Sequence, residues 1–311
     1  MWPFKKKKID PLDTRLLSWR RGDPFTIADM LRSVVCFGQT GSGKSSGSGY
    51  GLARAILGTN AGMLILCSKP EDRGWWLART AEAGRSEDVI LFAEDSKERI
   101  NFLDFESKSR GDARTLTQFL MTASEVLIAQ GQRDQEAFWR SLNERIIYNA
   151  VVPVLTAYGK ADAPSIQQFI NTAAYDTKQL ADPGWLARYH NQTMAKADKA
   201  DKTSIERFDF DQAKEFWPGE FASMDDKPRS SGLLGVNNCL HTFNSGLVRE
   251  LCSTTTTFTP LDMEKGAIVI ADFPIPTYQL AGKFVCSGLK YLTQRHILRR
   301  TFTSGEPPIV I

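Results

Sequence analysis

The chain has 311 residues and a formal net charge of +3, with 42% hydrophobic and 24% charged residues. These values are ordinary for a soluble globular protein, and they exclude a collagen, a disulfide-stapled mini-protein and a wholly disordered chain. No stretch of the sequence approaches about eighteen consecutive apolar residues, so we predict no membrane-spanning helix. The length corresponds to about two average domains.

Residues 1–24 are predicted to form a basic N-terminal arm, in which Lys5 to Lys8 are consecutive. No apolar segment follows these lysines, so the start of the chain does not resemble a secretory signal. An arm of this kind binds nucleic acid or an anionic membrane surface, or it remains a solvated tail. We expect a cytoplasmic protein, which lipid binding by the arm would bring to the inner face of the membrane.

The five cysteines are Cys36, Cys67, Cys239, Cys252 and Cys286, and no two of them have the CxxC spacing of a redox or zinc motif. Three of them lie within apolar runs, where cysteine behaves as a small hydrophobic residue. We therefore expect reduced thiols in the core of the protein.

A strand–helix–strand pattern follows the arm. Residues 33–37 and 63–67 are short apolar runs typical of buried strands, and residues 44–57 between them have the spacing of a helix. Residues 89–92 predict a further strand. This order is that of a βαβ unit, so residues 25–110 are predicted to form the first part of a core with a parallel sheet.

Residues 111–255 are predicted to form an α-rich insertion. Apolar residues recur at helical spacing over 116–127 and over 139–154. Ser165 to Gln168 match a capping box, which predicts that a helix starts there. Residues 185–230 are polar and interrupted by proline and glycine, so we expect irregular structure before helical spacing returns.

Residues 256–311 return to the α/β pattern and are predicted to form the second part of the core. Ala267 to Ile270 are expected to form a strand, and a helix over 278–300 follows it. Ile309 to Ile311 follow two prolines and have the composition of another buried strand. Because a central strand needs further residues and a polar exit, we expect the chain to be a fragment of a longer protein.

A glycine-rich motif carries the most specific chemistry in the sequence. It consists of Gly38, Gln39, Thr40, Gly41, Ser42, Gly43, Lys44 and Ser45, and it matches GxxxxGK[ST]. In such a loop the backbone N–H groups and the positive end of the next helix bind phosphate. We expect Lys44 to reach the β and γ phosphates, Ser45 to hold Mg²⁺ and Ser46 to bond the α phosphate. A guanine-reading Asn-Lys-x-Asp motif is absent, so the expected ligand is ATP with Mg²⁺.

Hydrolysis of ATP also needs an acid at a strand end, to hold Mg²⁺ and position water. Asp272, which follows the strand predicted near 267–271, is the candidate within the chain, and a strand-end residue facing solvent is the alternative. The other candidate strand is 309–311, whose acid would follow Ile311. We therefore expect ATPase activity from the full-length protein, whereas this chain binds nucleotide and lacks part of the hydrolytic machinery.

Several segments of the sequence resemble the FtsK–HerA superfamily of hexameric DNA translocases, and most closely the type IV secretion coupling proteins and conjugation ATPases. Thr40 to Ser45 resemble their phosphate-binding loop. Ile65 to Glu71 resemble their second strand, although Ser68 stands where aspartate is usual, so no role is transferred to it. Arg99 to Asp104 resemble their Asn-Pro-Leu segment, and Ser230 to Leu234 resemble the stretch that joins the all-α domain to the motor core.

The resemblance implies an α/β protein with a RecA-like P-loop NTPase core, a mostly parallel sheet and an inserted all-α domain. It also implies a homo-hexamer that passes DNA through a central channel and works with a conjugation or secretion machinery. In such hexamers a neighbouring subunit supplies an arginine to the γ phosphate. Arg229, Arg249 and Arg295 are candidates by position, and a surface or structural arginine is the alternative for each.

Three functions are open from the sequence. The first is a motor that couples ATP hydrolysis to translocation of DNA or of a DNA–protein substrate. The second is an ATPase that drives the assembly of a secretion apparatus or pilus without gripping DNA. The third is a nucleotide-binding structural module without turnover.

Overall fold

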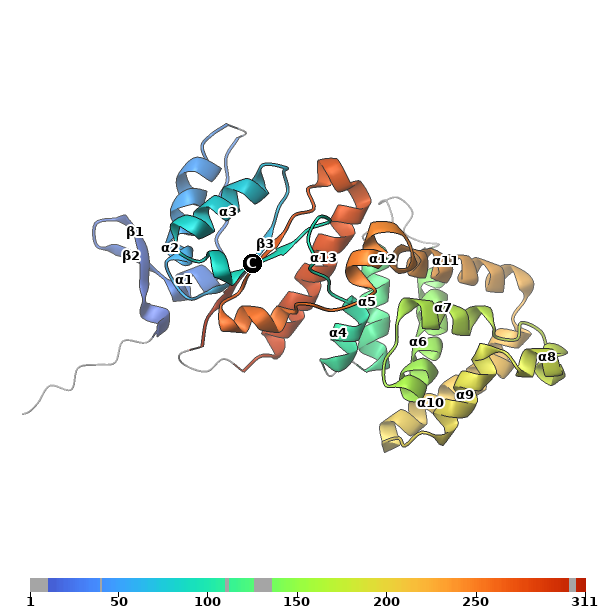
Figure 1. Cartoon of the computed structure of the whole chain (residues 1–311). Helices are drawn as coiled ribbons and strands as arrows, with labels where there is room; N and C mark the ends of the chain where they lie inside the picture. The colour runs from blue at the N-terminus through green and yellow to red at the C-terminus, as the bar shows by residue number, and fades with distance from the viewer. Residues whose placement is uncertain (1–10, 40, 110–111, 126–135, 302–305) are drawn as a thin grey trace, which may run out of the picture. The chain divides into compact units, whose positions relative to one another are not determined.

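The computed structural model describes residues 11–39, 41–109, 112–125, 136–301 and 306–311. It divides into two compact units, which we call the sheet unit and the helical unit (Figure 1). The sheet unit comprises Met1–Glu98, Phe258–Gly282 and Lys290–Ile311, and the helical unit comprises Arg99–Thr257 and Lys283–Leu289. The protein is thus an α/β protein with a parallel sheet and a helical region.

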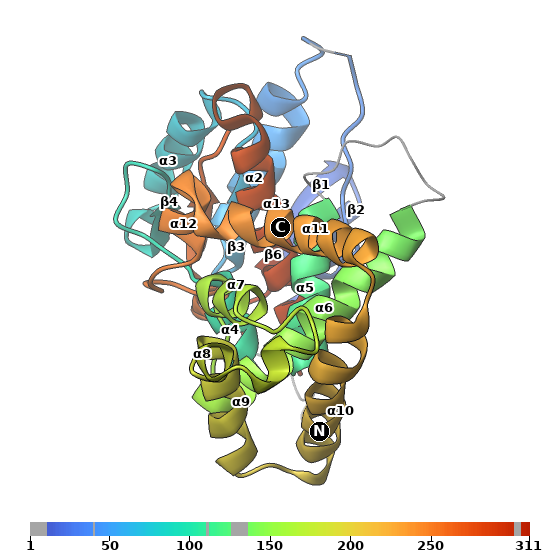
Figure 2. The same ribbon diagram turned by 90° about the vertical axis from the view of Figure 1, so that its right-hand side faces the viewer.

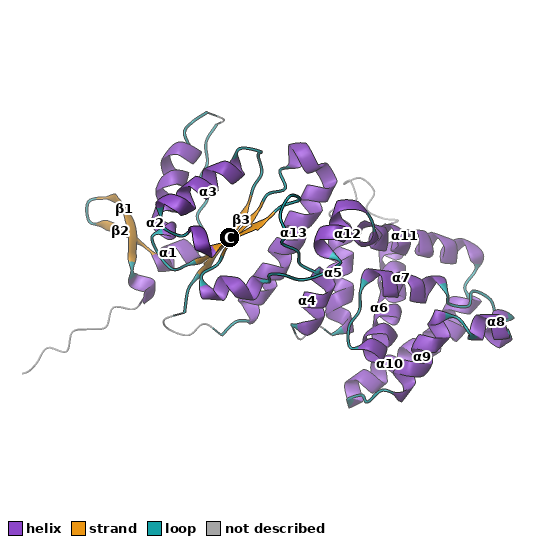
Figure 3. Cartoon of the chain, viewed as in Figure 1, coloured by secondary structure: helices purple, strands orange, loops and turns teal. Residues whose placement is uncertain are grey.

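The sheet has four parallel strands in the order β4-β5-β3-β6. Figure 3 draws the strands in orange and the helices in purple. These strands are β3 (Gly62–Leu66), β4 (Val89–Phe92), β5 (Ile268–Ala271) and β6 (Ile309–Val310). All residues of β5 are buried, as expected for a central strand of a parallel sheet, which is covered on both faces. The structure therefore confirms the strands predicted near 63–67, 89–92 and 267–270 and the parallel arrangement.

One face of the sheet packs against α2 (Tyr50–Leu57) and α3 (Asp72–Glu82). Alternate residues of β3 and β5 form a buried cluster with Ile56 and Leu57 at the end of α2. Trp76 and Leu77 of α3 pack against the same cluster. Period-two strands and an amphipathic helix bury these side chains together, and this burial holds the core of the sheet unit.

The prediction of a strand over residues 33–37 is wrong. The structure has no regular element there, and Val35 and Phe37 are 67% and 91% exposed. Ser33 has a positive φ of 83°, which interrupts an extended backbone. An apolar, β-branched run becomes a strand only where a neighbouring strand pairs with it, and none of the four strands of this sheet does so.

The region predicted as a basic arm contains regular structure. Residues 15–26 form an antiparallel hairpin of β1 (Arg15–Arg20) and β2 (Asp23–Thr26), followed by α1 (Ile27–Leu31). Thr26 and Asp29 form a capping box at the start of α1. The consecutive lysines lie outside the described residues.

The helical unit is built around one long helix, α6 (Glu136–Tyr158), which contacts α5, α7, α9, α10 and α11 (Figure 2). Residues 146–154 of α6 are buried except for the half-buried Tyr148, as expected of a helix segment that is enclosed by neighbouring helices on several sides. The other helices are α4 (Phe102–Lys108), α5 (Ala113–Glu125), α7 (Ala163–Asn171), α8 (Pro183–Leu186), α9 (Tyr189–Lys199), α10 (Ser204–Phe216), α11 (Asp226–Asn244) and α12 (Gly246–Cys252).

Two local predictions in the helical unit are wrong. The helix predicted to start at Ser165 starts earlier, because the Asp162 carboxylate accepts a hydrogen bond from the Ser165 N–H at 2.8 Å and caps α7. The range 185–230 is largely helical, not irregular. Thr203 and Glu206 form a capping box there, and α10 buries Phe210 and Phe216 against its neighbours.

The helix predicted over 278–300 is confirmed as α13 (Ile275–Arg299), which has a kink at Gln279, where φ is 49°. None of the helices in the described ranges combines the length and the apolar character that crossing a bilayer requires. The cysteines are all free, and Cys67, Cys239 and Cys252 are buried as expected. Cys36 is exposed, because the segment around it joins no sheet.

Candidate functional site

The glycine-rich loop precedes the π-helical turn η2 (Ser45–Gly49), which continues into α2. Gly41 and Gly43 have φ angles of 81° and 78°, a left-handed conformation that residues with a side chain rarely adopt. Such alternation of backbone conformation turns successive N–H groups toward one side, which forms a concave anion-binding surface. Thr40 lies outside the described residues.

Lys44 closes the loop on itself. Its Nζ donates to the Gly38 carbonyl oxygen at 2.6 Å and to the Gln39 carbonyl oxygen at 2.7 Å. The ammonium group is therefore held by the same loop whose backbone would meet a ligand. Ser45 and Ser46 are exposed at the start of the helix, and Ser46 Oγ lies 3.4 Å from the Gly43 carbonyl oxygen.

The start of α2 lies beside the start of α3, near the edge of the sheet where the parallel strands end. The ring of Tyr50, the first residue of α2, lies 6.3 Å from the ring of Trp75. Trp75 is in the first turn of α3, which follows the carboxyl end of β3. Open α/β sheets bind ligands at this edge. The start of α2 is therefore placed where a ligand of such a sheet is expected, whereas the described residues of 33–43 before it are exposed and follow no strand of the sheet.

A charged cluster occupies the same edge. Arg73 of α3 donates from Nη1 to both carboxylate oxygens of Asp95 at 3.0 Å, and Asp95 follows β4. The same nitrogen lies 3.4 Å from Asp272 Oδ2, and Asp272 directly follows β5. The segments that follow β3, β4 and β5 thus bring one guanidinium and two carboxylates together.

Asp272 is the most enclosed member of this cluster, since its side chain is only 13% exposed. Burial raises the pKa of Asp272 above its usual value, while the nearby Arg73 acts against that rise. Its Oδ1 atom is buried and has no hydrogen-bond partner within the described residues. A carboxylate oxygen in this state has free capacity to accept a hydrogen bond from water or a ligand.

The three arginines expected as candidates for a neighbouring subunit's site are in different surroundings. Arg229 is 8% exposed, donates to the Met224 carbonyl oxygen at 2.6 Å and pairs with Asp226. Arg295 donates to the Tyr291 hydroxyl at 2.9 Å. Arg249 is exposed on α12. Arg249 is therefore open to solvent, whereas Arg229 stabilises the start of α11.

Several residues of this edge were missed by the sequence analysis, namely Arg73, Asp95, Tyr50 and Trp75. The sequence pattern could have indicated Asp95, because it is an acidic residue three positions after the strand predicted over 89–92. Asp272 was found by the same pattern, since it directly follows the strand near 267–271. Arg73 had none, because its role depends on two carboxylates that are distant in the sequence. No group of three or more His, Cys, Asp or Glu side chains in the described part of the chain is placed to hold a metal ion.

No protein-family model, no curated protein and no solved structure matches this chain.

Proposed function

We propose that this protein binds ATP with Mg²⁺ through the loop at residues 38–46, as the nucleotide-binding part of a RecA-like P-loop ATPase. The observation that carries the proposal is the Lys44 ammonium group held over the loop by the Gly38 and Gln39 carbonyl oxygens. A bound triphosphate would form an ion pair with this ammonium group. The cost would be small, because water can replace the ammonium as the hydrogen-bond donor to the two carbonyl oxygens.

The other residues of the loop fit the same ligand. The left-handed glycines direct backbone donors toward an anion, and the exposed Ser45 hydroxyl is available for Mg²⁺. Mg²⁺, when bound, would neutralise charge on the phosphate oxygens, and few protein ligands are needed because it keeps waters and binds phosphate directly.

The wider function that we propose is a motor subunit that couples ATP hydrolysis to translocation of DNA or of a DNA–protein substrate in conjugation or type IV secretion. The resemblance of the loop and of the flanking phrases supports it, together with a parallel α/β unit and a separate helical unit. In this proposal the subunit acts in a homo-hexamer, and Arg249 is the residue offered to the neighbouring nucleotide.

A nucleotide-binding module without turnover is the second candidate. The observation that favours it is the contact between Asp272 and Arg73, because a carboxylate paired with a guanidinium is a poor base for activating water. Turnover would require Asp272 to leave Arg73, or another acid to act.

The experiment is isothermal titration of MgATP into the wild-type chain and into Lys44→Ala and Lys160→Ala variants. Lys160 is an exposed lysine of the helical unit and serves as the control. We expect Lys44→Ala to weaken binding by about tenfold to a hundredfold, the value of a charge-assisted contact, and Lys160→Ala to bind as the wild type does. Equal affinities for all three proteins would refute nucleotide binding by this loop. ATPase activity stimulated by DNA would distinguish the motor from the module without turnover.

A further inference from the structure

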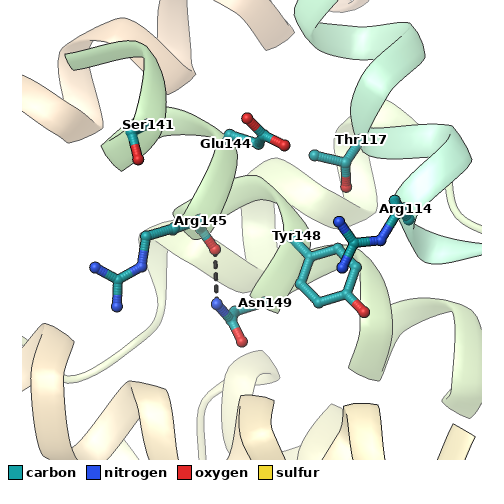
Figure 4. A pocket seen from close by; sticks show the side chains of 7 residues that line it. All are labelled: Arg114, Thr117, Ser141, Glu144, Arg145, Tyr148 and Asn149. Atoms are coloured by element: carbon teal, nitrogen blue, oxygen red, sulfur yellow. Dashed lines mark hydrogen bonds between the residues drawn. The ribbon is translucent and has the colours of Figure 1, made fainter. Parts of the chain in front are cut away.

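A groove in the helical unit has no part in the site described above. It consists of two adjoining cavities of about 260 and 430 Å³, which share Arg114, Arg145, Tyr148 and Asn149 (Figure 4). Helices α5, α6 and α10 and the π-helical turn η5 (Trp217–Phe221) form its walls. All of these elements belong to one compact unit, so the groove is a property of that unit alone.

Aromatic surface lines one side of the groove. Phe208 and Phe216 of α10 line the larger cavity together with Tyr148 of α6. Phe208 is 65% exposed, and Ile205, one turn earlier on the same helix, is 74% exposed. Two large apolar side chains at helical neighbour positions thus lie uncovered beside a cavity, which is typical of a surface that binds a partner.

Both arginines of the groove are already engaged. Arg145 forms an ion pair with Glu220, and its guanidinium lies 5.8 Å from the Phe216 ring. The guanidinium of Arg114 lies 5.4 Å from the ring of Tyr148, toward which it is turned in Figure 4. The positive charge in the groove is therefore largely committed to protein groups.

The acidic side chains of the groove are in excess. Burial and, after it, the negative charge of Asp209 raise the pKa of Tyr148 to about 12, so the phenol stays neutral beside that carboxylate. Glu144 and Glu215 line the cavities and pair with no cation among the described residues. Figure 4 shows the Glu144 carboxylate facing the cavity across from Thr117.

We infer that this groove binds a basic peptide segment of a partner protein, one that carries lysine or arginine next to an aromatic side chain. The cationic groups of the peptide would pair with Glu144 and Glu215, and the aromatic ring would cover Phe208 and Ile205. Charge complementarity selects this occupant, because a phosphate or nucleic acid would bring its negative charge against the unpaired carboxylates. The inference concerns the helical unit and does not rest on nucleotide binding by the loop.

The test uses the full chain and a fluorescein-labelled hexapeptide of four lysines and two phenylalanines, followed by fluorescence anisotropy. A hexapeptide of four glutamates and two phenylalanines is the control ligand. We expect the basic peptide to bind and the acidic peptide not to bind. Failure of the basic peptide to bind, or equal binding of both, would overturn the inference.

Variants locate the binding. The double variant Glu144→Gln, Glu215→Gln should weaken the basic peptide by about tenfold or more, and Phe208→Ser should weaken it as well. Asp211→Asn is the matched control, since Asp211 is an exposed acid of α10 that does not line the groove. Lys44→Ala should leave peptide binding unchanged, which separates this inference from the proposed function. An equal loss in Asp211→Asn would show non-specific attraction by surface carboxylates and would refute the groove.

Discussion

Arg73 Nη1 lies 3.4 Å from Asp272 Oδ2, although 199 positions separate the two residues in the chain. The contact exists because β3 and β5 are adjacent and parallel, so that α3, which follows β3, starts beside the residue that follows β5. Asp95 joins from the end of β4 on the other side of β5. One guanidinium thereby pairs with two carboxylates at the edge of the sheet.

Replacing Arg73 tests whether this cluster holds the strand ends together. Arg73→Gln leaves Asp95 and Asp272 as like charges without their shared partner, and we expect the free energy of unfolding to fall by about 1–3 kcal/mol. Urea unfolding at neutral pH measures the change. The exposed Arg207 is the control, and Arg207→Gln should change the stability by less than about 0.5 kcal/mol. Equal stabilities of the two variants would show that the cluster contributes nothing.

A matched pair of glycines tests the geometry of the loop. Gly43→Ala places a side chain at a φ of 78°, at a cost of about 1–2 kcal/mol or a distorted loop, and MgATP affinity should fall by about tenfold. Gly47 is two positions beyond Ser45, has no positive φ, and has open space where a Cβ would lie. Gly47→Ala should therefore bind as the wild type does in the same titration. Loss of affinity in Gly47→Ala alone would contradict this geometry.

His190 predicts a dependence of stability on pH. Burial lowers the pKa of His190 from 6.5 to about 4, against the opposing effect of its hydrogen bond to the Phe169 carbonyl oxygen. Between these values the unfolded chain binds the proton and the folded chain does not, so the stabilisation is complete above about pH 6.5 and is lost as the pH falls toward 4. The loss amounts to about 3 kcal/mol for this one group.

Urea unfolding at pH 7 and pH 4.5 measures this loss. The His190 ring stacks on Phe169 with centroids 4.1 Å apart, so His190→Phe keeps an aromatic ring in place and should reduce the pH dependence. His241 is exposed, and His241→Gln should leave the dependence as it is in the wild type. A pH dependence that His190→Phe does not change would show that another group is responsible.

Phe37 distinguishes the structure from the sequence prediction. If Phe37 lay in a buried strand, Phe37→Ala would lower the free energy of unfolding by about 3–5 kcal/mol. Because Phe37 is 91% exposed, we expect this substitution to lower it by less than about 0.5 kcal/mol. Phe92 of β4 is fully buried and provides the comparison, with an expected loss of about 3–5 kcal/mol for Phe92→Ala. A large loss on Phe37→Ala, measured by urea unfolding, would place residues 33–37 in a core.

The sequence was sufficient for features that depend on a few neighbouring residues. Met63 to Leu66 and Val89 to Phe92 are apolar runs of strand length, and both are strands of the sheet. The spacing of Leu142, Ile146 and Ala150 predicted a helix, and all three are buried on α6. The left-handed backbone of the loop was also foreseeable, because Gly41 and Gly43 adopt positive φ angles as a local property of consecutive residues.

Long-range contacts decided what the local pattern left undetermined. Residues 33–37 have the composition of a strand and pair with none of the four strands of the sheet. Asp272 was predicted to be either the acid for hydrolysis or a strand-end residue facing solvent, and in the structure it is largely enclosed and contacts Arg73. The groove depends on residues of α6 and α10, which line one surface only because these two helices pack together. Helical spacing and capping are set within about one turn of chain, whereas strand pairing, ion pairs and cavities depend on which distant segments become neighbours after folding.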